Sequence, residues 1–131
     1  MKRIRHYIHT GEGFARVHEA EKWTVAQKNA GPSNYRDSVH VLECHHTSDE
    51  VFVLLKGHAW MMEGVVKDGR VLEILEEPMS RYEVYLIPRG TWHNTWMEPG
   101  AMFVIMENIE VSYDNTEVLH FEDTIPRSTG Q

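Results

Sequence analysis

The sequence predicts an all-β protein that folds as one small barrel. From residue 39 onward the apolar segments are short, rich in β-branched and aromatic residues, and bounded by turn-forming residues. This pattern is typical of many short strands and not of helices. A chain of 131 residues suits a single domain with one buried core. We therefore expect one domain over residues 1–131.

Each expected strand is a short apolar run or an alternation of apolar and polar residues. The candidates are Val39 to His45, Val51 to Leu55, His58 to Val66, Val71 to Leu75, Val84 to Ile87, Thr91 to Trp96, Ala101 to Glu107 and Glu117 to Phe121. About eight strands of this kind are enough to close a barrel.

Turn-forming residues separate these strands. Asp68 and Gly69 supply the positive φ angles of a two-residue hairpin turn. Pro99 with Gly100 marks a second turn, and the segment 88–90 (Pro-Arg-Gly) marks a third that leads toward His93.

Residues 1–35 are expected to form an N-terminal extension of strands and irregular chain. The glycines at 11 and 13 interrupt any element there, and Ala15 to Lys22 fits either a short helix or an irregular arm. Trp23 to Lys28 reads as an added strand, whose edge would favour pairing with a second copy of the chain. Gly31 to Tyr35 is then a loop that leads into the central strands.

Composition excludes several kinds of partner. The chain has 13 Lys and Arg against 20 Asp and Glu, a formal net charge of −7, which repels phosphate backbones and anionic lipids. The single cysteine allows no intrachain disulfide, and no apolar run is long enough to span a membrane. The first residues lack the apolar core of a signal peptide. We expect a cytoplasmic protein without nucleic-acid or membrane partners.

Two short patterns carry metal-ligating residues. The first is H-x4-E-x6-G from His45 through Glu50 to Gly57, and the second is P-x-G-x2-H, which ends at His93. Two histidines and a carboxylate from separate strands, with open positions beside them, suit Fe(II) and similar divalent ions. Glu50 also precedes the apolar run 51–55, where a charge entering the barrel needs a cation or a hydrogen-bond donor.

These patterns resemble the two signature motifs of the cupin superfamily and span residues 43–93, within the segment 39–108. The resemblance implies a double-stranded β-helix of the jelly-roll type. It further implies a divalent metal (Fe, Mn, Ni or Zn) held by two histidines, a glutamate and a third histidine. His45, Glu50 and His93 then occupy three of the four ligand positions.

The match departs from the family pattern at several positions. The first motif begins H-x-H in the family, and Glu43 stands at the first of these positions. A spacer shorter by one residue instead makes His46 the ligand, with Cys44 in the first position. In the second motif, Tyr82 replaces a glycine and Met97 replaces an asparagine.

Strand alternation leaves the choice between His45 and His46 open. One strand face carries Glu43 and His45, and the other carries Cys44 and His46. The second face is the more apolar, whereas the family spacing favours the first. Glu43 itself is a candidate ligand, a hydrogen-bond acceptor for a ligand histidine or an outward-facing residue.

A ligand pocket is expected beside the metal. Its candidate residues are His58, Trp60, Met62, Tyr85 and Trp92, since apolar walls with few polar groups favour compact ligands with one polar end. The alternative is that the Trp and Met residues only fill a core.

Two functional hypotheses follow, because one fold hosts many activities. The first is a metal-dependent cupin enzyme, of dioxygenase or isomerase type, acting on a small carbonyl- or hydroxyl-bearing metabolite. The alternative is a non-catalytic cupin that binds a small molecule, with or without a metal. In either case we expect a homodimer, since cupin barrels commonly pair.

Overall fold

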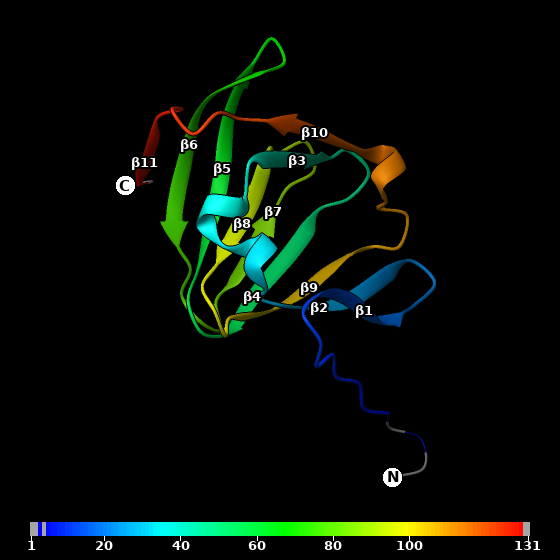
Figure 1. Ribbon diagram of the computed structural model, residues 1–131. Helices are drawn as coiled ribbons and strands as arrows, with labels where there is room; N and C mark the ends of the chain where they lie inside the picture. The colour runs from blue at the N-terminus through cyan, green and yellow to red at the C-terminus, as the bar shows by residue number, and fades with distance from the viewer. Residues whose placement is uncertain (1–2, 4, 130–131) are drawn as a thin grey trace.

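The computed structural model describes residue 3 and residues 5–129, and it has an all-β fold made of two facing sheets (Figure 1). The five-stranded sheet has the order β1 (Gly13–Glu19), β2 (Trp23–Asn29), β9 (Met102–Asn108), β4 (Glu50–Lys56) and β7 (Val84–Ile87). The six-stranded sheet has the order β10 (Thr116–His120), β3 (Val41–His45), β8 (His93–Met97), β5 (Ala59–Lys67), β6 (Arg70–Pro78) and β11 (Arg127–Thr129).

Paired strands run antiparallel except β11, which lies parallel to β6. Three short 3-10 turns complete the described chain: η1 (Pro32–Asn34), η2 (Arg36–Ser38) and η3 (Tyr113–Asn115). No helix within the described residues is long and apolar enough to cross a membrane. The predicted all-β, jelly-roll fold class is confirmed.

The N-terminal segment corrects two expectations. Ala15 to Lys22 forms neither a helix nor an irregular arm, because most of it lies in β1, which pairs with β2 from Gly13 opposite Asn29 onward. Trp23 does begin a strand, but β2 lies between β1 and β9 and is not an edge strand. Its backbone groups are therefore paired within the chain and cannot add to a partner's sheet.

The hairpin between β5 and β6 has the predicted turn. Asp68 and Gly69 have φ angles of 53° and 73°, as a two-residue turn between antiparallel strands requires. The hairpin extends beyond the rest of the barrel at the top of Figure 1.

The main core lies between the two sheets. Its buried residues are Ala26, Phe52, Leu54, Ala59, Met79, Ile87, Met97, Ala101, Phe103 and Ile105. Phe52 and Phe103 meet edge to face with ring centroids 5.4 Å apart, a favoured geometry for aromatic pairs. This core fills one part of the space between the sheets and leaves the rest to the polar site described below.

A second core lies on the outer face of the six-stranded sheet. It contains Val39, Leu42, Met62, Val71, Ile74 and Phe121. Residues outside the strands also contribute, since Val39 precedes β3 and Phe121 follows β10. The six-stranded sheet is thus buried on both faces at its centre.

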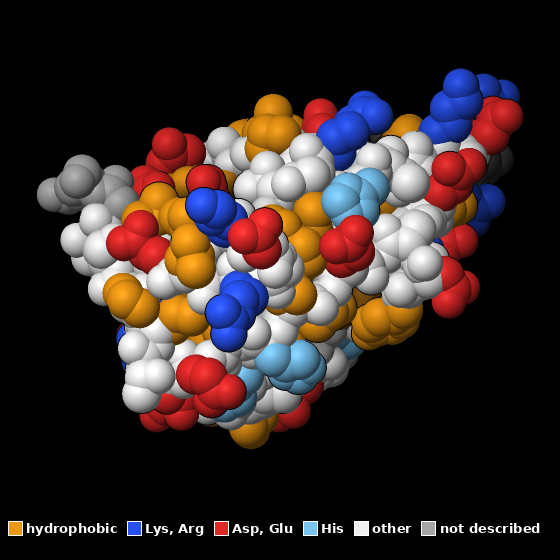
Figure 2. Space-filling view, turned by 90° about the horizontal axis from the view of Figure 1, so that it is seen from above, with side chains coloured by type: hydrophobic (Ala, Val, Ile, Leu, Met, Phe, Trp, Pro, Cys, Tyr) orange, Lys and Arg blue, Asp and Glu red, His pale blue; other side chains and the backbone are white. Residues whose placement is uncertain are grey.

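The outer face of the five-stranded sheet remains apolar and uncovered by described residues. Cross-strand neighbours on this face include Val51 with Leu86 and Met106, and Val53 with Val84. Val84 and Leu86 are 65% and 59% exposed. By contrast, the face viewed from above intersperses acidic, basic and hydrophobic side chains (Figure 2).

Candidate metal centre

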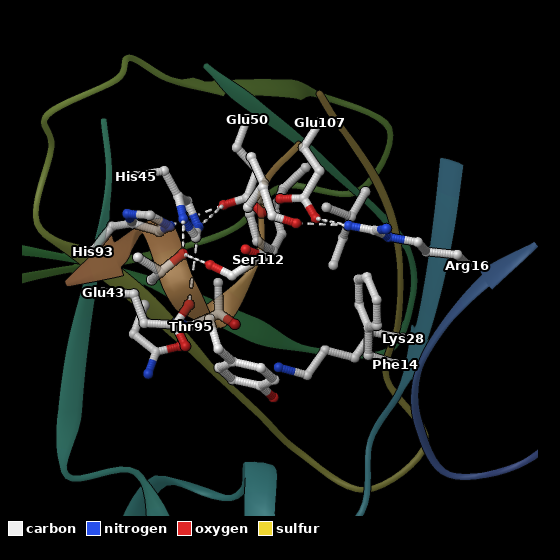
Figure 3. Close-up of a pocket in the computed structure, with 16 residues that line it drawn as sticks. Phe14, Arg16, Lys28, Glu43, His45, Glu50, His93, Thr95, Glu107 and Ser112 are labelled. Carbon is white, nitrogen blue, oxygen red and sulfur yellow. Dashed lines mark hydrogen bonds and ion pairs between the residues drawn. The ribbon is translucent and has the colours of Figure 1, made fainter. Parts of the chain in front are cut away.

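Three buried side chains from both sheets meet between them. His45 ends β3, His93 begins β8, and Glu50 begins β4 on the facing sheet. The Nε2 atoms of His93 and His45 lie 2.9 and 3.6 Å from Glu50 Oε1, and one ligand atom from each residue lies within 4.8 Å of the others. Figure 3 shows the two imidazoles and the carboxylate directed toward one another.

Hydrogen bonds fix the orientation of both imidazoles. His93 Nδ1 lies 2.9 Å from the carbonyl oxygen of Thr91, so Nδ1 must carry the proton and donate it. His45 Nδ1 lies 2.9 Å from Thr116 Oγ1, and that hydroxyl donates its own proton to the Ser112 carbonyl. The hydroxyl therefore accepts from His45, and both Nε2 atoms are left facing Glu50.

This donor set fits a divalent metal ion. Three ligands bonded at about 2.1 Å and roughly at right angles would lie about 3 Å from one another, close to the separations of 2.9 and 3.6 Å between the histidine nitrogens and Glu50. Each ligating histidine has a partner for its other ring nitrogen, as metal sites require. His45, Glu50 and His93 are thus able to hold a metal through three facial ligands.

Without a metal the three groups stabilise one another as an ion-paired cluster. Burial opposes the charge of Glu50, but the two histidines outweigh it and hold the pKa of that carboxyl well below its usual range. The hydrogen bond to Glu50 raises the pKa of His45. For His93, burial acts to lower the pKa, but Glu50 prevails and the pKa is raised.

A second carboxyl, Glu107, adjoins this cluster. Glu107 lies opposite Glu50 across β9 and β4 and is 9% exposed. Burial and the neighbouring Glu50 carboxylate raise the pKa of Glu107 to about 8. Arg16, from β1, places Nη2 3.8 Å from Glu107 Oε1 and also donates to the Val111 carbonyl at 2.9 Å.

The structure brings together only part of the predicted ligand set. His45 enters the cluster, whereas His46 lies just beyond β3, half-exposed, with Nε2 3.0 Å from Glu117 Oε1. Because adjacent strand residues face opposite ways, selecting His45 directs Cys44 into the outer sheet face, where it is fully buried. Glu43 lies beside the cluster, with Oε2 3.9 Å from His45 Nε2, and outside the set of three.

A cavity of about 460 Å³ opens beside the cluster, within the usual range for small-molecule sites. Its walls combine the metal-ligand candidates with two cations and several apolar side chains. The lining residues are Phe14, Arg16, Lys28, Glu43, His45, Glu50, Phe52, His93, Asn94, Thr95, Ile105, Glu107, Val111, Ser112, Tyr113 and Thr116.

The five residues predicted to bind a ligand lie outside this lining. Trp60 stacks on Trp96 with centroids 4.0 Å apart, Met62 is fully buried in the second core, and Trp92 packs against that core. Inward-facing His93 forces its neighbour Trp92 to the opposite face of the sheet. His58 is exposed beside the turn at Gly57, and Tyr85 packs on the main core.

Sequence reasoning missed three charged residues of the cavity: Arg16, Lys28 and Glu107. Lys28 and Glu107 occupy inward positions of their strands, each two residues after a buried apolar residue, Ala26 and Ile105. That alternation is a usable signal, because a charged residue at an inward position of a strand needs a functional partner. Arg16 carried no such signal, since β1 was not recognised as a strand.

Comparisons with known proteins identify the fold. No protein-family model matches the sequence, and no curated protein is significantly similar to it. A cupin-2 domain protein from Shewanella frigidimarina has 16% identity and a TM-score of 0.53, over 77% of this chain and 84% of that one. KdgF from Halomonas sp. has 12% identity and a TM-score of 0.52, over 82% and 90%.

A third similar structure is Streptomyces PAC13, solved with uridine. It has 9% identity and a TM-score of 0.59, over 90% of this chain and 92% of that one. Together with the His-Glu-His cluster, these likenesses show that the chain has the fold of the cupin superfamily, as the two motifs predicted.

Proposed function

We propose that this protein is a metal-dependent cupin enzyme acting on a small carbonyl- or hydroxyl-bearing metabolite. The observation that carries the proposal is the buried His45, Glu50 and His93 cluster, which faces a cavity large enough for such a molecule. A divalent ion bound there would supply Lewis-acid chemistry or, as Fe(II), O2 activation of the dioxygenase type.

The protein groups around this centre have distinct roles in the proposal. His45, Glu50 and His93, which line the cavity, would hold the ion. In the metal-free protein, burial and Glu50 raise the pKa of Glu107 to about 8, so that Glu107 carries a proton near neutral pH. It is therefore able to donate a proton to, or later accept one from, an oxygen of a bound substrate.

The first test is metal content. Protein purified without chelator and reconstituted separately with Fe(II), Mn(II), Ni(II) and Zn(II) should hold about one ion per chain. His93→Ala should bind none, because it removes a ligand, whereas His58→Ala, an exposed histidine away from the cluster, should bind as the wild type does. A wild type that stays metal-free by elemental analysis after reconstitution would refute the metal-dependent function.

The second test concerns turnover. Oxygen consumption and proton NMR of the metal-loaded protein mixed with small keto and hydroxy acids would separate dioxygenase from isomerase chemistry. Metal binding without any product formation across such a panel would favour the second candidate.

That second candidate is a non-catalytic cupin that binds a small molecule. Glu43 favours it, because a carboxylate stands where the family motif has its first histidine, and this carboxylate remains outside the cluster of three. In this case His45, Glu50 and His93 would orient a ligand by hydrogen bonds rather than through an ion.

We also propose that the protein is a homodimer. The support comes from the apolar outer face of the five-stranded sheet, on which Val84 and Leu86 are more than half exposed. A contiguous apolar sheet face is unusual on a monomer and suits an isologous contact with a second copy.

A further inference from the structure

Lys28 is a cation directed into the cavity without a partner among the described residues. Its side chain leaves β2 and extends from the wall opposite His45 and His93 toward the middle of the cavity (Figure 3). Its ammonium forms no hydrogen bond or ion pair with any residue that the structure describes, whereas Arg16 is held by both Glu107 and Val111. The Lys28 nitrogen also remains accessible from the cavity.

This ammonium group is poorly solvated. Burial lowers the pKa of Lys28, and the more distant carboxylates of Glu43 and Glu50 only partly oppose that effect. A charge removed from water without a close counter-ion is costly. An anion entering the cavity would supply the missing hydrogen-bonded partner, and charge-assisted hydrogen bonds of this kind are the strong ones.

The charges of the whole cavity also favour an anion once a metal is bound. Glu107 at most cancels the charge of Arg16, and Glu43 partly offsets the charge of Lys28. Glu50 neutralises only one of the two charges of a divalent ion, so the cavity retains a net positive charge. Between the two cationic ends, Phe14, Phe52 and Ile105 supply apolar walls.

We propose that the cavity selects small organic carboxylates that bear a hydroxyl or carbonyl group. The carboxylate pairs with Lys28, the organic body lies against the apolar walls, and the hydroxyl or carbonyl oxygen faces His45, Glu50 and His93. This inference rests on the proposed function, because it assigns the substrate class of the same site.

The test compares carboxylates with their neutral amides. Glycolate, lactate and mandelate, each against its amide, are titrated by calorimetry into the Zn(II)-reconstituted protein. The wild type should bind at least one acid about tenfold more tightly than its amide, the usual scale for one charge-assisted hydrogen bond. Lys28→Met should remove this preference and Lys28→Arg should retain it, whereas Lys67→Met, an exposed lysine at the hairpin, should behave as the wild type does.

Metal content is measured for every variant, so that two failures stay separate. A metal-loaded wild type that binds acids and amides equally, or binds neither, overturns the selection of carboxylates and leaves the metal centre intact. An acid preference that survives in Lys28→Met belongs to the metal and overturns the role of Lys28. A protein that holds no metal but shows a Lys28-dependent preference for acids contradicts the proposed function alone.

Discussion

The two histidines of the cluster owe their orientation to groups outside it. Thr91 supplies a backbone carbonyl and Thr116 a hydroxyl that is itself held by Ser112. Each partner occupies one ring nitrogen and thereby directs the other toward Glu50. The geometry of the cluster therefore depends on these hydrogen bonds as well as on its three side chains.

The first prediction at this scale concerns pH. The folded-state pKa values of His45, His93 and Glu107 are all raised. A raised pKa stabilises the folded state below the unfolded-state value, and this stabilisation is lost as pH rises through the folded value. The metal-free protein should therefore be more stable at about pH 5.5 than at about pH 8.5 in urea unfolding with chelator present.

Glu50 does not oppose this trend, because its lowered pKa contributes stability that is lost only as pH falls below the ordinary carboxyl value. The lowered pKa of Lys28 acts in the opposite direction, as one group against three. Glu107→Gln should flatten the slope up to about pH 8, because a carboxyl with a raised pKa affects stability only between its ordinary pKa of 4.5 and its folded-state pKa. Added metal should reverse it, since binding requires deprotonated histidines and strengthens as pH rises. Stability of the metal-free protein that increases from pH 5.5 to 8.5 would contradict the assigned direction of these shifts.

The second prediction at this scale concerns Tyr82. This residue has a φ of 71°, a left-handed conformation that costs about 1–2 kcal/mol outside glycine, and it stands where the cupin motif has glycine. Its side chain is 73% exposed, so its removal sacrifices little packing. Tyr82→Gly should raise the free energy of unfolding by up to about 1 kcal/mol, once the greater freedom of glycine in the unfolded chain is subtracted. Tyr113→Gly, an exposed tyrosine in η3, should not stabilise; equal effects would rule out backbone strain as the reason.

At the scale of elements, the barrel depends on a close approach at the turn between β4 and β5. Gly57 has a φ of 75°, and a Cβ there would lie 2.7 Å from the Cα of Ala101. The atoms that a Cβ would meet here belong to the Ala101 backbone, which cannot rotate away as a flexible side chain could. The glycine of the first motif is thus explained by two independent constraints, one on φ and one on space.

Gly57→Ala should therefore destabilise the fold more than Gly100→Ala. Gly100 also has a positive φ, 86°, but a Cβ there would meet nothing within 4 Å. Gly100→Ala, the control, should lose only the cost of the backbone conformation, about 1–2 kcal/mol. Gly57→Ala should lose about 1–3 kcal/mol more, because its new methyl group overpacks against Ala101. Equal midpoints of denaturation for the two variants would show that the Ala101 contact is relieved at no cost.

At the scale of the whole molecule, the proposed dimer places two apolar sheet faces together. Leu86→Glu introduces a charge on this face and should convert the dimer to a monomer, because burying an unpaired carboxylate in the interface is costly. Leu72→Glu, at an exposed leucine of β6, is the matched control and should remain dimeric. Light scattering that reports a monomer for the wild type at micromolar concentration would refute the dimer.

The sequence alone determined the features that depend on local pattern. Alternation and turn residues predicted the strands from β3 to β10, the Asp68-Gly69 hairpin and the all-β class. Motif spacing predicted that His45, Glu50 and His93 would meet in one cluster. The intervals between these residues are fixed by the strands that carry them, so they can be recognised in the sequence.

Only the tertiary structure decided which strand faces enclose the cavity. The way in which the two sheets face each other decides three features of the site. It places His45 rather than His46 in the cluster, buries Met62 in the second core and brings Lys28 and Glu107 into the cavity. Local pattern gives two equivalent faces to each strand, and a strand in a sheet covered on both sides is apolar on both. The pairing of distant segments, such as β2 with β9, removes that equivalence and so completes the site.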